Sequence, residues 1–220
     1  MDIMTLVSMP VITAMAMIIV AIISFITGRL NEKYKTNLEY RTFLDIEEIL
    51  SSYNVGNSPT AKVGTKLLLP LSYKKLLNFL MDKRLDSDPD FTKSNRFNYL
   101  KIRILGKSII IGGEVKILFE NNENTLIEMN LPLLQPNEEI YIPLDISFNN
   151  LWGNPEPIKE IEIKYRLQTG QSMRFMSKRT QQDHGETRTD SYEILKFFKY
   201  QKIHKYNGND ASWMYTANHE

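Results

Sequence analysis

Residues 100–119, LKIRILGKSIIIGGEVKILF, alternate apolar side chains with charged ones near both ends of the stretch. Alternation with a period of two places one face of a β-strand on a core and the other in water. Glycines lie between the two alternating runs, and glycine favours turns. We therefore expect two neighbouring strands here, each with one buried face.

The same alternation recurs further along the chain. Short runs of this kind, separated by turn-forming residues, are typical of a β-sandwich or a small barrel, and we expect about seven strands. Thr169 and Gly170 are expected to close a tight hairpin over residues 160–177. The expected inward-facing residues of the later strands are Ile127, Met129 and Leu131; Ile140, Ile142 and Leu144; and Ile161, Ile163, Tyr165 and Leu167.

Residues 100–119, followed by LPLLQPNEEIYIPL (131–144) and IEIKYRLQTGQSMRFMSK (161–178), resemble a pattern found in membrane-tethered bacterial proteins with an immunoglobulin-like sandwich. In that pattern, two strands around a glycine-containing turn precede a leucine–proline–acidic strand entry and a closing hairpin. The chain departs from it at residues 108–110, where a Gly-Pro is more usual. The resemblance implies an immunoglobulin-like fold and carries over no functional residue.

The N-terminal residues 5–27, TLVSMPVITAMAMIIVAIISFIT, contain no charged side chain. As a helix with a rise of about 1.5 Å per residue they cover roughly 34 Å, enough for the ~30 Å hydrocarbon core of a bilayer. A cleaved signal peptide would need a basic start and a small-residue cleavage site, and neither is clear here. A buried core helix of this length would be unusual in a chain of 220 residues. We favour a retained single-pass transmembrane helix.

Basic residues follow this span, and no lysine or arginine precedes it. Basic flanks tend to remain in the cytoplasm, so we expect the large C-terminal part on the cytoplasmic side of the cell membrane. The absence of cysteine is compatible with a reducing compartment. The flanking basic residues are Arg29, Lys33, Lys35 and Arg41.

Small residues recur on one face of the expected span at Ala14, Ala21, Ser24 and Gly28. Small side chains let helix backbones approach closely in lipid, so this row is a possible helix–helix contact for a homo-oligomer. The alternative is ordinary transmembrane composition, which is also rich in alanine, serine and glycine.

The expected organisation is mainly β, with one helical anchor. Residues 38–46, LEYRTFLDI, alternate and favour a first strand, although a helical stalk is the alternative for the residues after the span. Residues 73–85 follow a possible N-cap at Ser72 and have the spacing of one short amphipathic helix. The expected parts are a transmembrane anchor (1–28), a juxtamembrane stalk or first strand (29–60), the β-sandwich (61–206) and a flexible tail (207–220).

Charge is unevenly distributed, although the net charge is only +1. Residues 107–158 contain eight acidic and two basic residues, whereas residues 159–205 contain eleven basic and six acidic ones. Neighbouring strands of opposite charge in one sheet would explain this, and a basic face near an anionic leaflet is the alternative.

Near the C-terminus, residues 191–206, SYEILKFFKYQKIHKY, predict an aromatic and basic strand. Aromatic side chains on its inner face with lysines outside are the favoured interpretation. A membrane or partner contact through Lys196, Phe197, Lys199 and Lys202 is the second, and binding of nucleic acid is unlikely on this pattern.

No motif predicts catalysis, a cofactor or a metal. The acidic run at residues 86–90 lacks the glycine and glutamate of a calcium loop, because Phe91 and Phe97 stand at those positions. The three histidines have no zinc-site spacing, and no phosphate-binding glycine motif occurs. We therefore expect a non-enzymatic protein-interaction or scaffolding module that contacts the bilayer and a protein partner. The alternative is a membrane-associated sensor or effector, for example in bacterial defence, that oligomerises through its transmembrane helix.

Overall fold

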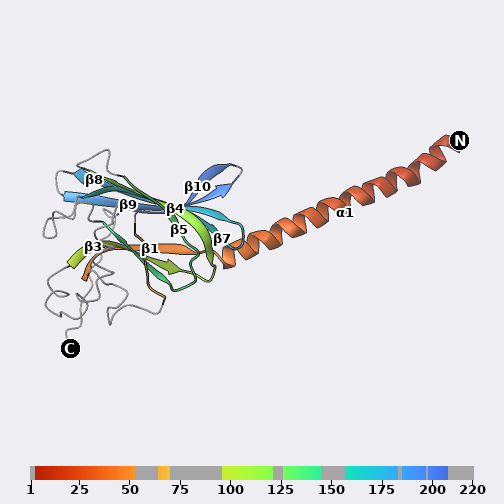
Figure 1. Cartoon of the computed structure of the whole chain (residues 1–220). Helices are drawn as coiled ribbons and strands as arrows, with labels where there is room; N and C mark the ends of the chain where they lie inside the picture. The colour runs from red at the N-terminus through yellow and green to blue at the C-terminus, as the bar shows by residue number, and fades with distance from the viewer. Residues whose placement is uncertain are drawn as a thin grey trace, which may run out of the picture. The chain divides into compact units, whose positions relative to one another are not determined.

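The computed structural model of the chain describes residues 3–52, 64–69, 96–120, 126–144, 157–182, 185–196 and 198–207. The described residues form one helix and two β-sheets (Figure 1). They fall into two units, Met1–Arg41 and Thr42–Glu220, and the second is called the β unit below. The predicted amphipathic helix at residues 73–85 lies outside the described residues.

Helix α1 (Ile3–Glu39) contains the whole apolar stretch. Its apolar side chains between Val11 and Leu30 are exposed rather than packed in a core, which argues against the buried-helix alternative. By length and composition the described chain therefore has one helix able to cross a membrane. The choice between a retained span and a cleaved signal stays a prediction.

The helix continues past the apolar stretch, so the residues expected as either a stalk or a strand are divided between the two. Residues 29–39 are helical, and β1 (Phe43–Ser52) begins after Thr42. The expectation of a strand from Leu38 is wrong for its first residues and correct from Phe43 onwards. Once a long helix exists, each further residue adds a hydrogen bond at little entropic cost, which outweighs a short alternating pattern.

Two sheets make up the β unit. One has the strand order β1-β3-β6-β2 and the other β10-β9-β8-β7-β4-β5. Neighbouring strands are antiparallel except β2 and β6, which are parallel. The remaining strands are β2 (Lys66–Leu67), β3 (Arg96–Leu105), β4 (Ile110–Phe119), β5 (Leu126–Leu131), β6 (Glu139–Pro143), β7 (Ile158–Leu167), β8 (Ser172–Gln182), β9 (Gly185–Lys196) and β10 (Lys199–Asn207).

Apolar side chains from both sheets form one buried core, the arrangement of a β-sandwich. The predicted inner faces are confirmed: Leu100, Ile102 and Ile104 of β3 and Val115, Ile117 and Phe119 of β4 are all buried. The predicted hairpin is confirmed too, since β7 pairs with β8 and Gly170 has a φ of 81° in the turn between them.

Two strand predictions need correction. In β6 both faces are buried, including Glu139 and Tyr141, because it lies inside its sheet between β3 and β2. The single strand expected at residues 191–206 is two strands, since β9 ends at Lys196 and β10 begins at Lys199. The chain reverses there with Phe198 at a φ of 65°, and no glycine, asparagine or proline marked that turn.

Strand β1 is an edge strand of its sheet, and side chains of the other sheet cap its edge. The Tyr165 hydroxyl donates to the Thr42 carbonyl at 2.9 Å, and Arg188 Nη2 donates to the Ile46 carbonyl at 3.1 Å. Between them, the Tyr192 hydroxyl donates to the Leu44 carbonyl. Two alternate carbonyls of β1 and that of the residue before it are thereby satisfied, which joins the two sheets and closes an edge that otherwise invites pairing with other chains.

Candidate functional site

The row of small residues predicted for the anchor lies on α1. Ala14, Ala21, Ser24 and Gly28 are all helical and exposed, and a Cβ added at Gly28 would meet no atom within 4 Å. Helical periodicity places them within an arc of roughly 80°. Their use in a helix–helix contact stays a prediction.

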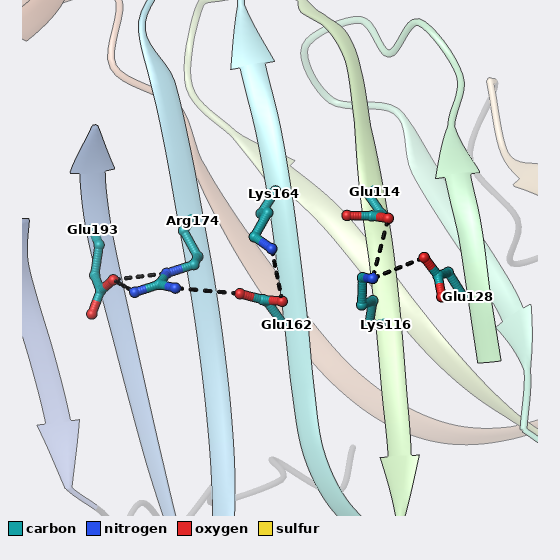
Figure 2. Close-up of polar contacts among 7 residues, drawn as sticks. All are labelled: Glu114, Lys116, Glu128, Glu162, Lys164, Arg174 and Glu193. Atoms are coloured by element: carbon teal, nitrogen blue, oxygen red, sulfur yellow. Dashed lines mark hydrogen bonds and ion pairs between the residues drawn. The ribbon is translucent and has the colours of Figure 1, made fainter. Parts of the chain in front are cut away.

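Charged side chains form a row across the outer face of the six-stranded sheet (Figure 2). Arg174 on β8 lies between Glu193 on β9 and Glu162 on β7, with its Nε 2.8 Å from the Glu193 carboxylate and its Nη1 3.4 Å from the Glu162 carboxylate. Lys164 is 3.1 Å from Glu162. These cross-strand pairs stabilise the sheet by joining its neighbouring strands.

The row continues onto β4 and β5, where Lys116 is 3.3 Å from Glu114 and 2.8 Å from Glu128 (Figure 2). The ion pairs in this row lie within the acidic segment or within the basic segment. The register also places Glu114 opposite Lys164 and Lys116 opposite Glu162, so opposite charges of the two segments are neighbours on β4 and β7, as predicted, although this accounts for only part of the charge. Each segment neutralises part of its own charge, which leaves a basic excess in residues 159–205 to be located.

An open depression of about 440 Å³ lies on the same face. One of its lining residues is Gly113, where a Cβ would come within 2.3 Å of the Lys164 carbonyl oxygen, so β4 and β7 approach too closely for any other residue. Its other lining residues include Ile111, Lys164, Arg166 and Tyr200. Ligand pockets enclose most of their ligand; because this depression is open and Lys164 is already paired, we assign no ligand to it.

One end of the β unit contains both Thr42, its first residue, and several turns; we call it the junction end. Thr42 is fully buried there and its hydroxyl accepts from the Ser108 N–H, in the β3–β4 turn, at 3.1 Å. Gln168, in the β7–β8 turn, donates its N–H to the Ile109 carbonyl at 2.9 Å. These hydrogen bonds fix the start of β1 against two turns.

The β9–β10 turn lies at the junction end as well. Tyr165, which holds Thr42, is the register partner of Met173, and Met173 is the partner of Ile194. Strands β7 and β9 run in the same direction, so the residues after Ile194 extend towards the end where β7 finishes. The turn between Lys196 and Lys199 therefore belongs to the end at which the chain enters the β unit.

The residues near the C-terminus that were predicted to contact a membrane or partner lie in two places, at the β9–β10 turn and further along β10. Lys196 and Lys199 are register partners at the turn, and Lys202 lies further along β10 beside a β-bulge. All three are exposed, and Phe197 lies outside the described residues. The prediction of an aromatic inner face is wrong for Phe198, which is 102 % exposed, and Leu195, which the sequence did not single out, is 41 % exposed.

Six exposed residues at the junction end form a basic rim with apolar side chains at the β9–β10 turn. We call this set the junction rim. It consists of Lys107, Arg166, Leu195, Lys196, Phe198 and Lys199. None of its four basic members forms an ion pair with another residue that the structure describes. Within the described part of the chain, much of the unpaired basic excess lies here and along β10, and a further unpaired lysine, Lys159, lies at the start of β7, at the opposite end of the β unit.

Titratable groups of the β unit are perturbed in its interior. Burial, followed by the charge of Asp190, raises the pKa of Tyr192 above its ordinary value. Burial, followed by the charge of Glu139, raises the pKa of Tyr141 to about 12. Both changes favour the neutral phenol, as expected for hydroxyls that hold structure together rather than transfer protons.

Among the described residues, no group of three or more histidine, cysteine, aspartate or glutamate side chains is placed to hold a metal ion. His204 is exposed on β10, and the other two histidines and the acidic run at residues 86–90 lie outside the described residues.

Comparisons with known proteins identify no relative: no protein-family model, curated protein or solved structure matches the chain.

Proposed function

We propose that the protein is a single-pass membrane protein whose β unit, an immunoglobulin-like sandwich, recruits or scaffolds a protein partner on the cytoplasmic side. The observation that carries the proposal is the direct connection of an exposed apolar helix to a folded β unit. Only Tyr40, Arg41 and Thr42 separate the end of α1 from β1. Such a tether confines the β unit to a thin layer at the bilayer, where its effective concentration towards another membrane-bound protein is high.

The basic flank after the apolar stretch supports the cytoplasmic orientation, and the alternation pattern of residues 100–178 supports the immunoglobulin-like description. Alkaline extraction of membranes tests the anchor, because an integral protein stays in the pellet. A reporter fused after Glu220 tests the orientation. Recovery of the chain in the soluble fraction, or activity of the reporter outside the cell, would overturn the proposal.

The partner is tested by crosslinking in intact membranes followed by purification of the full chain. A matched control is a chain that keeps the whole β unit but has an unrelated transmembrane helix in place of its own anchor. A partner that is captured with both chains binds the β unit. Failure to recover any specific protein with either chain would contradict a scaffolding role.

A second candidate function is a sensor or effector that oligomerises through its helix. The exposed row of Ala14, Ala21, Ser24 and Gly28 supports it, because the helix offers a close-packing face. Gly28→Leu would reduce self-association in a membrane two-hybrid assay, whereas Ile19→Leu would leave it unchanged. Equal association of both variants would exclude this contact.

A further inference from the structure

We infer that the junction rim binds an anionic phospholipid surface, so that the β unit rests on the bilayer that holds its own anchor. The inference rests on the proposed function, because the anchor is what brings the β unit to lipid. It adds a second membrane contact, made by the basic and apolar side chains of the junction rim and separate from the anchor.

Charge is the first argument. From residue 194 to residue 209 the chain has four lysines and no acidic residue. Two of these lysines, Lys196 and Lys199, are directly opposite each other at the turn, where like charges repel unless an anion lies nearby. Lys107, in the β3–β4 turn, and Arg166, near the end of β7, add two further positive charges at the same end. Glu138, whose carbonyl accepts from Ile104 at this end, is already paired with Lys66 at 2.9 Å.

The turn itself is the second argument. Phe198 is fully exposed with a φ of 65°, a conformation that asparagine or glycine adopts far more readily than phenylalanine. The ring therefore makes no stabilising contact within the described part of the fold, and the backbone of Phe198 has an unfavourable conformation. Aromatic side chains flanked by lysines are favoured at the membrane–water interface, where the ring enters the headgroup region and the ammonium groups meet phosphate.

The shape of the site favours lipid over a folded protein or a nucleic acid. A specific protein interface needs about 800 Å² on each side, whereas the rim has only two apolar members, Leu195 and Phe198. The exposed Leu105 and Ile111 of the same end come from β3 and β4. A lipid bilayer can accommodate a small group of exposed apolar side chains without a complementary surface. Stacking on a nucleic acid needs successive aromatic platforms along a groove, and the described part of this end presents a single exposed ring.

The position of the rim is the third argument. Thr42 is the residue at which the chain enters the β unit, and the hydrogen bonds of Ser108 and Tyr165 hold it at the same end as the β9–β10 turn. The tethered end of the β unit is therefore also the end that carries four of its unpaired basic side chains and the exposed ring of Phe198.

The test uses the full chain in nanodiscs of phosphatidylcholine alone or of equal parts phosphatidylcholine and phosphatidylserine. Because the chain has no cysteine, a single Gln201→Cys carries an environment-sensitive fluorophore on β10, close to the turn. Thr180→Cys, an exposed residue of β8 that pairs with Thr187 near the opposite end, carries the same fluorophore as a matched control.

We expect the Gln201 label to shift to the blue and to be quenched by lipid-borne quenchers in the phosphatidylserine discs, and the Thr180 label to remain in water in both. Phe198→Asn suits the backbone of the turn and removes the ring, and Lys196→Gln with Lys199→Gln removes the charge. Each should return the Gln201 label to its behaviour in phosphatidylcholine, while circular dichroism shows the fold retained.

Equal access of water-soluble quencher to the Gln201 label in both kinds of disc would overturn the inference, as would shielding that survives Phe198→Asn. Shielding that appears only after a cytosolic extract is added would assign the rim to a protein and would also overturn it. These outcomes leave the anchor and the proposed scaffold intact. Loss of the anchor is detected separately, by alkaline extraction.

Discussion

The outer face of the six-stranded sheet and the junction rim both carry basic side chains, which are paired with carboxylates on the sheet and unpaired at the rim. Arg174, Lys164 and Lys116 are each paired with carboxylates in a row of charged side chains that crosses five neighbouring strands (Figure 2). Lys196 and Lys199 face each other across a turn and form no ion pair with any described residue. Paired charges fix strands to one another, whereas unpaired ones remain available to a ligand.

The residues of the two regions also differ in how closely other atoms surround them. The six-stranded sheet includes Gly113, which leaves no room for a Cβ, and Glu193, which is only 8 % exposed. At the rim, Phe198 touches little of the protein and Leu195 is 41 % exposed. Substitutions should therefore change stability in the first region and interactions in the second.

The largest effect is expected for Gly113→Ala. The new Cβ would lie 2.3 Å from the Lys164 carbonyl oxygen, so β4 and β7 would have to separate. We expect the free energy of unfolding to fall by about 3 kcal/mol or more. The measurement is urea unfolding of the full chain in detergent, followed by circular dichroism. Lys199→Ala is the control from the rim and should change stability by less than about 0.5 kcal/mol.

A somewhat smaller loss is expected for Arg174→Gln, because it leaves the partly buried Glu162 and Glu193 without their shared partner. Loss of one member of a well-buried pair costs about 3–5 kcal/mol, and partial exposure here reduces the expected loss to about 2 kcal/mol. The matched control is Arg166→Gln, on the neighbouring strand at the rim, which should be close to neutral. Equal losses for the two arginines would remove the distinction between the regions.

The inner faces of most strands were predictable from the sequence, because period-two alternation records directly which side chains leave water. Ile161, Ile163 and Tyr165 illustrate this: all three were expected inside and all three are buried. Strand β6 was misjudged because burial of both faces depends on which strands lie beside it, and neighbours along the sheet are not encoded locally.

The rim was only partly predictable. Lys196 and Lys199 were recognised from composition, but Phe198 was expected on the inner face of a single strand, because its turn has no glycine, asparagine or proline. Lys107 and Arg166 were missed for another reason. They come from distant parts of the chain, and only the register of β4, β7, β8 and β9 brings them to the same end as the β9–β10 turn.

Alkaline pH extends the comparison to the contact between the sheets. The pKa of Tyr192 is raised in the folded state, so its stabilising effect is fully present below the unfolded value of about 10 and is lost as the pH rises through the folded pKa. We expect stability to decline above about pH 10. Tyr192→Phe should lower stability by about 1 kcal/mol at neutral pH, because it removes the hydrogen bond to Leu44, and should make the alkaline decline shallower. An unchanged decline would show that other groups control it.

The smallest expected change has the opposite sign. Phe198→Asn should raise the free energy of unfolding by about 0.5–1 kcal/mol, because asparagine accepts a φ of 65° more readily and no packing is lost from a fully exposed ring. Leu195→Asn, at a neighbouring exposed site in extended backbone, should give no gain. If Phe198→Asn instead destabilises the β unit, the ring supports the fold, and the contrast between the paired sheet and the free rim no longer holds at this turn.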